Sequence, residues 1–121
     1  MTNVVAIRLA AVMGFLAVAL GAFGAHGLKA LLTQNVTTEI WEKAVFYHFI
    51  HTVMLFVLAL RRPVPSGPWL SFLVGILIFS GSLYLLAVSN VKWLGAITPL
   101  GGLSFLAGWL WLAISARKFD S

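Results

Sequence analysis

Four long apolar stretches make up most of this 121-residue chain, and short polar segments separate them. Each stretch holds about 20 residues or more, enough at ~1.5 Å per residue to cross a hydrocarbon core of ~30 Å. The pattern predicts transmembrane helices over residues 4–24, 38–60, 69–88 and 93–116. We therefore expect an all-α fold, an integral membrane four-helix bundle in which residues 1–121 form a single transmembrane domain.

The first stretch also has features of a secretory signal peptide, because Arg8 lies near its start and Ala17, Ala19 and Ala22 lie near its end. Its apolar run is longer than a usual signal core. Cleavage would also remove one span from a group of spans that are too hydrophobic to form a secreted product. We expect a retained first helix.

The segments between the spans carry signals of their own. Leucines at helical spacing within residues 26–38 predict a short interfacial helix. Thr38 is expected to cap the second span, with Glu39 and Glu42 in the first turns, where the helix dipole favours negative charge. Pro99 removes a backbone donor near the start of the fourth span and is expected to bend it there.

Composition supports a membrane location and narrows the function. Hydrophobic residues make up 61% of the chain, charged residues 9%, and the mean hydropathy is +1.02, so lipid must be the solvent. The net charge of +5 reflects a shortage of acids rather than a basic patch, which argues against nucleic acid as a partner. The absence of cysteine excludes disulfides, thiolate metal sites and a cysteine nucleophile.

Basic residues predict the orientation, because Lys and Arg in short loops stay on the cytoplasmic side. Four crossings place both termini and the second loop on one side, which we predict to be cytoplasmic. That side carries Arg8, Arg61, Arg62, Arg117 and Lys118, and the opposite side carries Lys29, Lys43 and Lys92. Tryptophans near the predicted span ends are expected in the headgroup region, namely Trp41, Trp69, Trp93 and Trp111.

Small residues recur at helical spacing on the first, third and fourth spans. Helices in lipid associate by close backbone approach at such residues and by interhelical hydrogen bonds. We expect these faces to meet inside the bundle, and the glycines predicted to pack there are Gly14, Gly21, Gly75, Gly101 and Gly108. A lumen lined by the same faces is the alternative.

The second span carries the polar residues most relevant to function. Tyr47, His48 and His51 project over neighbouring parts of one helix surface. His51 lies midway along the span, where a polar side chain faces the interior and finds a partner. The partner could be a Tyr hydroxyl, Ser80 or Ser82, or a carbonyl freed by the proline. Structural hydrogen bonding, proton handling or ligand contact, and metal or haem ligation all remain open.

His26 follows the first span between two glycines and is a second candidate. It could simply end the helix at the interface. It could also join Glu42, Lys43 and His48 in a polar cluster at the outer membrane face, where an imidazole would titrate in the physiological range.

Four segments together resemble a known family of small membrane proteins, the one catalogued as domain of unknown function 423, to which animal transmembrane protein 256 is similar. They are GAFGAHGLK at 21–29, YHFIHT at 47–52, FSGSLYLLA at 79–87 and TPLGGLSFLAGW at 98–109. The resemblance covers nearly the whole chain in the right order. It implies a bacterial inner-membrane protein of four helices and implies no activity.

The family pattern, as the resemblance implies it, leaves out His48. It falls on Gly21, Gly24, Ala25, His26, Tyr47, His51, Ser80, Gly81, Ser82, Tyr84, Pro99, Gly101 and Gly102. Because the family pattern leaves out His48, it weakens proposals that need both histidines of the second span. It favours a polar cluster of His26, Tyr47, His51, Ser80 and Ser82.

We therefore expect a non-enzymatic membrane protein that packs against lipid and either self-associates as a homo-oligomer or joins another membrane protein. The alternative is a small transporter or channel with a polar path at His26, Tyr47 and His51. We expect no catalytic residues, cofactor or metal, since the three acids lie outside the spans' centres and a Ser80–His51 pair would lack an orienting acid.

Overall fold

The computed structural model describes residues 1–120 and confirms the all-α membrane fold. Four helical segments are long and apolar enough to cross a membrane: Asn3–Ala25, Thr38–Ala59, Ser66–Ser89 and Lys92–Ile114. In chain order the elements are α1 (Asn3–Ala25), α2 (Lys29–Asn35), α3 (Thr38–Ala59), α4 (Ser66–Gly75), the π-helix η1 (Ile76–Ser80), α5 (Gly81–Ser89), the 3₁₀ helix η2 (Lys92–Ala96), α6 (Thr98–Ile114) and the 3₁₀ helix η3 (Ala116–Phe119).

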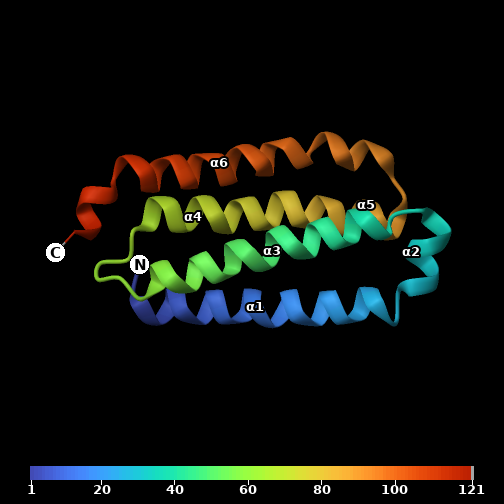
Figure 1. Ribbon diagram of the computed structural model, residues 1–121, viewed down its shortest axis with the longest axis horizontal. Helices are drawn as coiled ribbons and strands as arrows, with labels where there is room; N and C mark the ends of the chain where they lie inside the picture. The colour runs from blue at the N-terminus through green and yellow to red at the C-terminus, as the bar shows by residue number, and fades with distance from the viewer. Residues whose placement is uncertain (121) are drawn as a thin grey trace.

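The spans lie side by side in chain order, with both termini at one end (Figure 1). α3 packs against α1 on one side and against α4, η1 and α5 on the other, and α6 packs against α4 and η1. The outer spans α1 and α6 bury only 17% of their apolar windows, against 39% for α3 and 44% for the third span. α3 is therefore an inner helix, and α1 and α6 leave broad apolar faces for lipid or a partner.

The short helix predicted between the first two spans is present as α2, but two local predictions are wrong. Thr37, not Thr38, precedes the first turn of α3, and its hydroxyl donates a hydrogen bond to the Ala87 carbonyl at 2.8 Å instead of capping the helix. Pro99 lies in the first turn of α6, after η2. A proline there removes no helical hydrogen bond, so it helps to start the helix rather than to bend it.

Glycines of the third and fourth spans lie against aromatic side chains of the facing helix. A Cβ atom on Gly75 would lie 2.3 Å from Cδ1 of Phe105, and one on Gly108 would lie 2.6 Å from Cε1 of Phe72. A large ring therefore fills the space that each glycine leaves. Packing is looser on α1, where the nearest atoms to a Cβ on Gly14 and Gly21 belong to Thr52 at 3.5 Å and Val45 at 3.4 Å.

Gly101 of α6 lies directly against the backbone of the third span. A Cβ there would lie 2.3 Å from the backbone nitrogen of Phe79, which belongs to the π-helix η1. Because the obstacle is main chain, a rotamer change cannot relieve the clash. Contact between the third and fourth spans at this point requires glycine.

Two of the four tryptophans predicted for the headgroup region lie inside the protein instead. Trp41 is 4% exposed and Trp69 is fully buried. Their indole N–H groups donate to the carbonyls of Leu20 and Leu55, each at 3.0 Å. An indole N–H near a span end can donate a hydrogen bond to a lipid headgroup or to a carbonyl of a neighbouring helix. In this protein Trp41 and Trp69 both donate to a carbonyl.

We predict that Gly101→Ala destabilises the protein by about 1–3 kcal/mol, because the added methyl overpacks the contact with η1. Gly81→Ala is the matched control. It is also a helical glycine of the packed region, but its Cβ would have no atom within 4 Å. Better helix propensity should make it neutral or stabilising by about 0.5–1 kcal/mol. Thermal unfolding in detergent, followed by tryptophan fluorescence, measures both, and equal effects would contradict the proposed contact.

Candidate functional site

His51 lies at the centre of the polar site, on the side of α3 that faces α6. Its side chain is 4% exposed. Nδ1 lies 2.8 Å from the carbonyl oxygen of Tyr47, one turn earlier, and Nε2 lies 3.0 Å from the indole nitrogen of Trp109 on α6. The imidazole also stacks on Phe105, with ring centroids 3.7 Å apart. Two hydrogen bonds and an aromatic contact thus hold the ring.

The two partners fix the tautomer of His51. A carbonyl can only accept a hydrogen bond, so Nδ1 carries the proton, and an indole N–H can only donate, so Nε2 is the unprotonated acceptor. The ring is therefore neutral in this arrangement. A metal ion or substrate could reach Nε2 only by displacing Trp109.

The other predicted site residues are only partly brought together. Tyr47 stacks on His51, with centroids 6.1 Å apart, and its ring is 36% exposed. Ser80 donates to the Ala44 carbonyl at 2.7 Å, and Ser82 lies 2.6 Å from the Thr98 hydroxyl. Ser80 and Ser82 therefore link the third span to its neighbours, and the hydrogen-bond partners of His51 are other groups.

His26 lies apart from this cluster, at the exposed C-terminal end of α1. The predicted cluster of His26, Glu42, Lys43 and His48 at the outer face is not formed, because His48 is buried inside the protein whereas the other three are exposed. The sequence placed these residues near one end of the protein but could not show which way the α3 side chains point.

His48 is the functional candidate that the sequence analysis undervalued. It is 3% exposed, and its Nδ1 lies 2.8 Å from the Tyr84 hydroxyl of α5. Its imidazole also faces the backbone of Met13 on α1, and within residues 1–120 the hydroxyl of Thr52 is buried without a hydrogen-bond partner. Thr52 lies one turn beyond His48 and touches the Gly14 position of α1. In the sequence, the signal for this pair was the four-residue spacing of His48 and Thr52, which places both side chains on one face of a helix.

The described part of the chain holds no group of three or more His, Asp or Glu residues placed to bind a metal ion. The carboxylates of Glu39 and Glu42 are exposed at the α2 end of α3, away from the buried histidines. The arrangement around His51 can therefore supply hydrogen bonds and aromatic packing. It does not place an acid beside the imidazole.

Four apolar helices joined through buried polar contacts define the class of this molecule, a small polytopic membrane protein. Within that class, the chain belongs to the family described as protein of unknown function (DUF423), whose family model matches residues 20–102. This confirms the resemblance found in the sequence.

The chain is similar over nearly its whole length to bacterial membrane proteins. It is 43% identical to UPF0382 membrane protein YwdK of Bacillus subtilis over 120 residues, which cover 93% of this chain and 96% of the relative. It is 46% identical to UPF0382 membrane protein SH2409 of Staphylococcus haemolyticus over 118 residues, 93% of this chain and 95% of the relative. No solved structure matches the chain.

We predict that Trp109→Phe lowers the free energy of unfolding by about 1–3 kcal/mol, because it leaves a buried ring nitrogen of His51 without its donor. Trp93→Phe serves as the control, since Trp93 is 66% exposed. It should change the stability by less than about 0.5 kcal/mol. Denaturant titration in detergent micelles measures both variants. Equal losses would show that the indole contributes only apolar volume.

Proposed function

We propose that this protein is a non-enzymatic membrane protein that acts by contact and assembles with a second copy of itself. The supporting observation is that the inward-facing polar side chains are mostly engaged with neighbouring helices, whereas the outer helices α1 and α6 keep broad apolar faces. Polar groups used in this way hold a scaffold together. The free faces are then the surfaces on which a partner can act.

The outward face of α1 suits close contact better than that of α6. Ala11 and Ala22 are exposed and lie eleven residues apart, about three helical turns, so they share one face. Phe15 and Val18 lie between them and are 74% and 63% exposed. Small residues let two helices approach closely, and the side chains between them can interdigitate.

The assembly proposal predicts a mass of at least two chains for the protein extracted in mild detergent. Adding bulk to α1 in the double variant Ala11→Leu/Ala22→Leu should shift at least half of the protein to the single-chain mass. The matched control is Ala107→Leu/Ala113→Leu, at exposed alanines of α6. Light scattering coupled to gel filtration gives the mass, and a wild-type protein of one chain would reject self-association.

A small transporter or channel is the second candidate. The observation that favours it is the Thr52 hydroxyl, which is buried without a hydrogen-bond partner among residues 1–120 and lies one turn from the buried His48. Buried polar groups without partners are rare and often mark functional sites in membranes. The originally predicted path of His26, Tyr47 and His51 has less support, because both nitrogens of His51 are occupied.

Reconstituted liposomes distinguish the two candidates by proton flux under an imposed gradient. The contact function predicts flux equal to that of empty vesicles. A transporter predicts flux above that level that falls at least tenfold in His48→Gln and is unchanged in His26→Gln. Flux that falls in His48→Gln would reject the contact function and support a transporter or channel.

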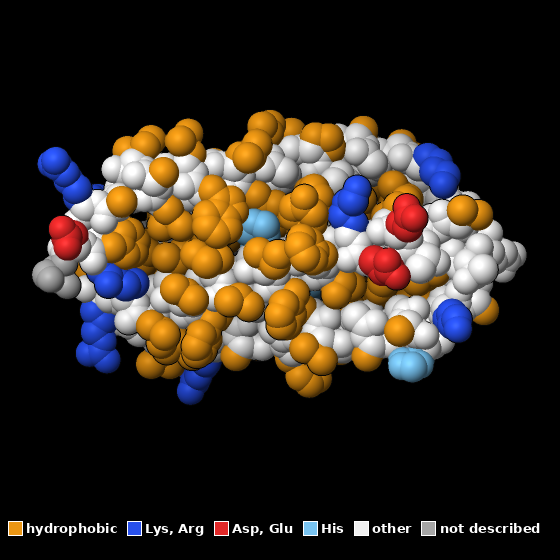
Figure 2. All heavy atoms as spheres, in the orientation of Figure 1, with side chains coloured by type: hydrophobic (Ala, Val, Ile, Leu, Met, Phe, Trp, Pro, Cys, Tyr) orange, Lys and Arg blue, Asp and Glu red, His pale blue; other side chains and the backbone are white. Residues whose placement is uncertain are grey.

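We further propose that the protein lies in the bacterial inner (cytoplasmic) membrane with both termini in the cytoplasm. Figure 2 shows Lys and Arg at both ends of the molecule and hydrophobic side chains across the middle. The end with both termini carries the greater number of basic residues, which supports the cytoplasmic assignment.

Single-cysteine labelling tests this orientation directly, because the chain has no cysteine of its own. Gln34→Cys, on α2, should react with a membrane-impermeant maleimide in intact cells. Ser66→Cys, at the opposite end of the molecule, should react only after permeabilisation. Both positions are exposed, so accessibility within the protein is matched. The reverse labelling pattern would invert the topology.

A further inference from the structure

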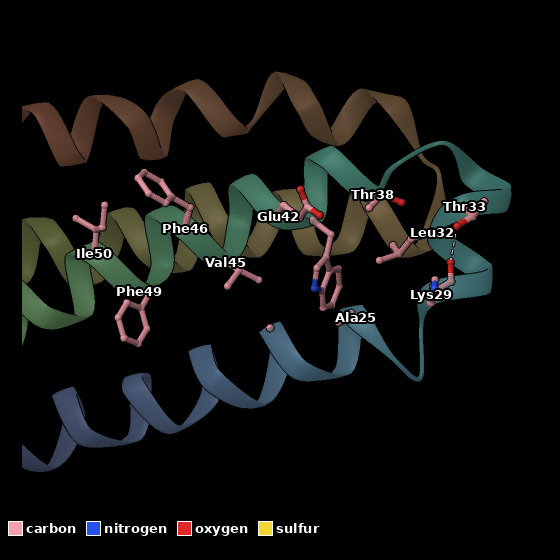
Figure 3. Close-up of a pocket in the computed structure, with 13 residues that line it drawn as sticks. Ala25, Lys29, Leu32, Thr33, Thr38, Glu42, Val45, Phe46, Phe49 and Ile50 are labelled. Atoms are coloured by element: carbon pink, nitrogen blue, oxygen red, sulfur yellow. Dashed lines mark hydrogen bonds between the residues drawn. The ribbon is translucent and has the colours of Figure 1, made fainter.

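A groove between α1 and α3 lies outside the polar site described above. It has a volume of about 610 Å³ and is formed by the last turns of α1, by α2 and by the first half of α3. In Figure 3, Val45 and Phe49 project from α3 toward α1, while Lys29 and Thr33 belong to α2. The volume falls within the ~300–1,000 Å³ that is typical of ligand pockets.

The groove exists because α1 presents small residues to α3 along this stretch. Gly21, Gly24 and Ala25 line it and fill little of the space between the two helices. Trp41 takes part of that space, since a Cβ on Gly24 would lie 2.1 Å from its indole nitrogen. That indole is anchored to the Leu20 carbonyl, so it forms a fixed wall of the groove.

The groove has an apolar shaft and a charged end. Val45, Phe49 and Ile50 line the shaft, and Lys29 and Glu42 line the end beside α2. Thr38 and Ile50 are twelve residues apart on one helix, so the whole groove extends about 18 Å along α3. A ligand complementary to this lining is largely apolar and presents both a negative and a positive group at one end.

The shape and the charges of the groove favour a lipid. The groove is long and is lined mainly by apolar side chains, and Lys29 and Glu42 lie at one end of it. This arrangement suits an acyl chain that ends in a headgroup with both a negative and a positive group.

We propose that this groove binds one phospholipid that carries an amine in a zwitterionic headgroup, as in phosphatidylethanolamine. Lys29 contacts the phosphate, Glu42 contacts the ammonium group, and an acyl chain lies between α1 and α3. An anionic lipid without an amine would set its only charge beside the carboxylate of Glu42, and so binds less well. The proposed self-association uses a different face of α1, about 100° around the helix from the residues that line the groove.

Native mass spectrometry of the full chain tests the proposal, with phosphatidylethanolamine and phosphatidylglycerol supplied in equal amounts in detergent. We expect one lipid adduct per chain, with phosphatidylethanolamine favoured at least threefold. Glu42→Gln should abolish that preference, and Lys29→Gln should weaken binding of both lipids. Lys43→Gln, next to Glu42 but outside the groove lining, should leave both properties unchanged.

Filling the groove supplies an independent test. Ala25→Trp should lower the retention of phosphatidylethanolamine at least tenfold, while Ala107→Trp, at an exposed alanine of α6, should not. Thermal unfolding of both variants confirms that they fold. Equal binding of the two lipids by the wild type, or equal retention by the two tryptophan variants, would overturn the proposal. Loss of a two-chain species in Ala25→Trp with no lipid adduct in the wild type would assign the groove to a second copy.

Discussion

The structure depends on hydrogen bonds that polar side chains donate to the backbone carbonyls of neighbouring helices. Trp41 links α3 to α1, Trp69 links α4 to α3, and Ser80 links η1 to α3. Apolar contact between helices gains little in lipid, because lipid tails are as apolar as leucine. An unpartnered polar group in the hydrocarbon costs several kcal/mol. A few donors therefore decide which helices are neighbours, and α3 takes part in all three contacts.

Aromatic and glycine packing then fixes how closely the helices approach. Phe72 and Phe105 fill the spaces left by Gly108 and Gly75 on the facing helix, and Phe105 also stacks on His51. This concentrates the polar and aromatic interior on one side of α3. On the other side α1 contributes mainly alanine and glycine, so it leaves a groove toward its C-terminal end. One face of α3 thus contributes mainly to the stability of the fold, and the other face borders the groove in which lipid binding is proposed.

The sequence predicted the four spans, the short helix α2 and the family, because these depend on length, composition and motif order. It identified His51 as central but not its partners. Helical spacing shows which residues share a face, yet it does not show which neighbour that face meets. For the same reason His48, which pairs with Tyr84 inside the protein, was undervalued, and Trp41 was expected at the headgroups. The π-helix η1 has no composition that distinguishes it from an ordinary apolar helix.

The central claim is that His51 is held as a neutral structural link between α3 and α6. Nitrogen-15 NMR of imidazole-labelled protein in lipid bicelles measures the protonation of each ring nitrogen directly. The structure predicts that Nδ1 of His51 is protonated and that Nε2 is unprotonated, since the partners are the Tyr47 carbonyl and the Trp109 indole N–H. A ring protonated at Nε2, alone or together with Nδ1, would contradict the account.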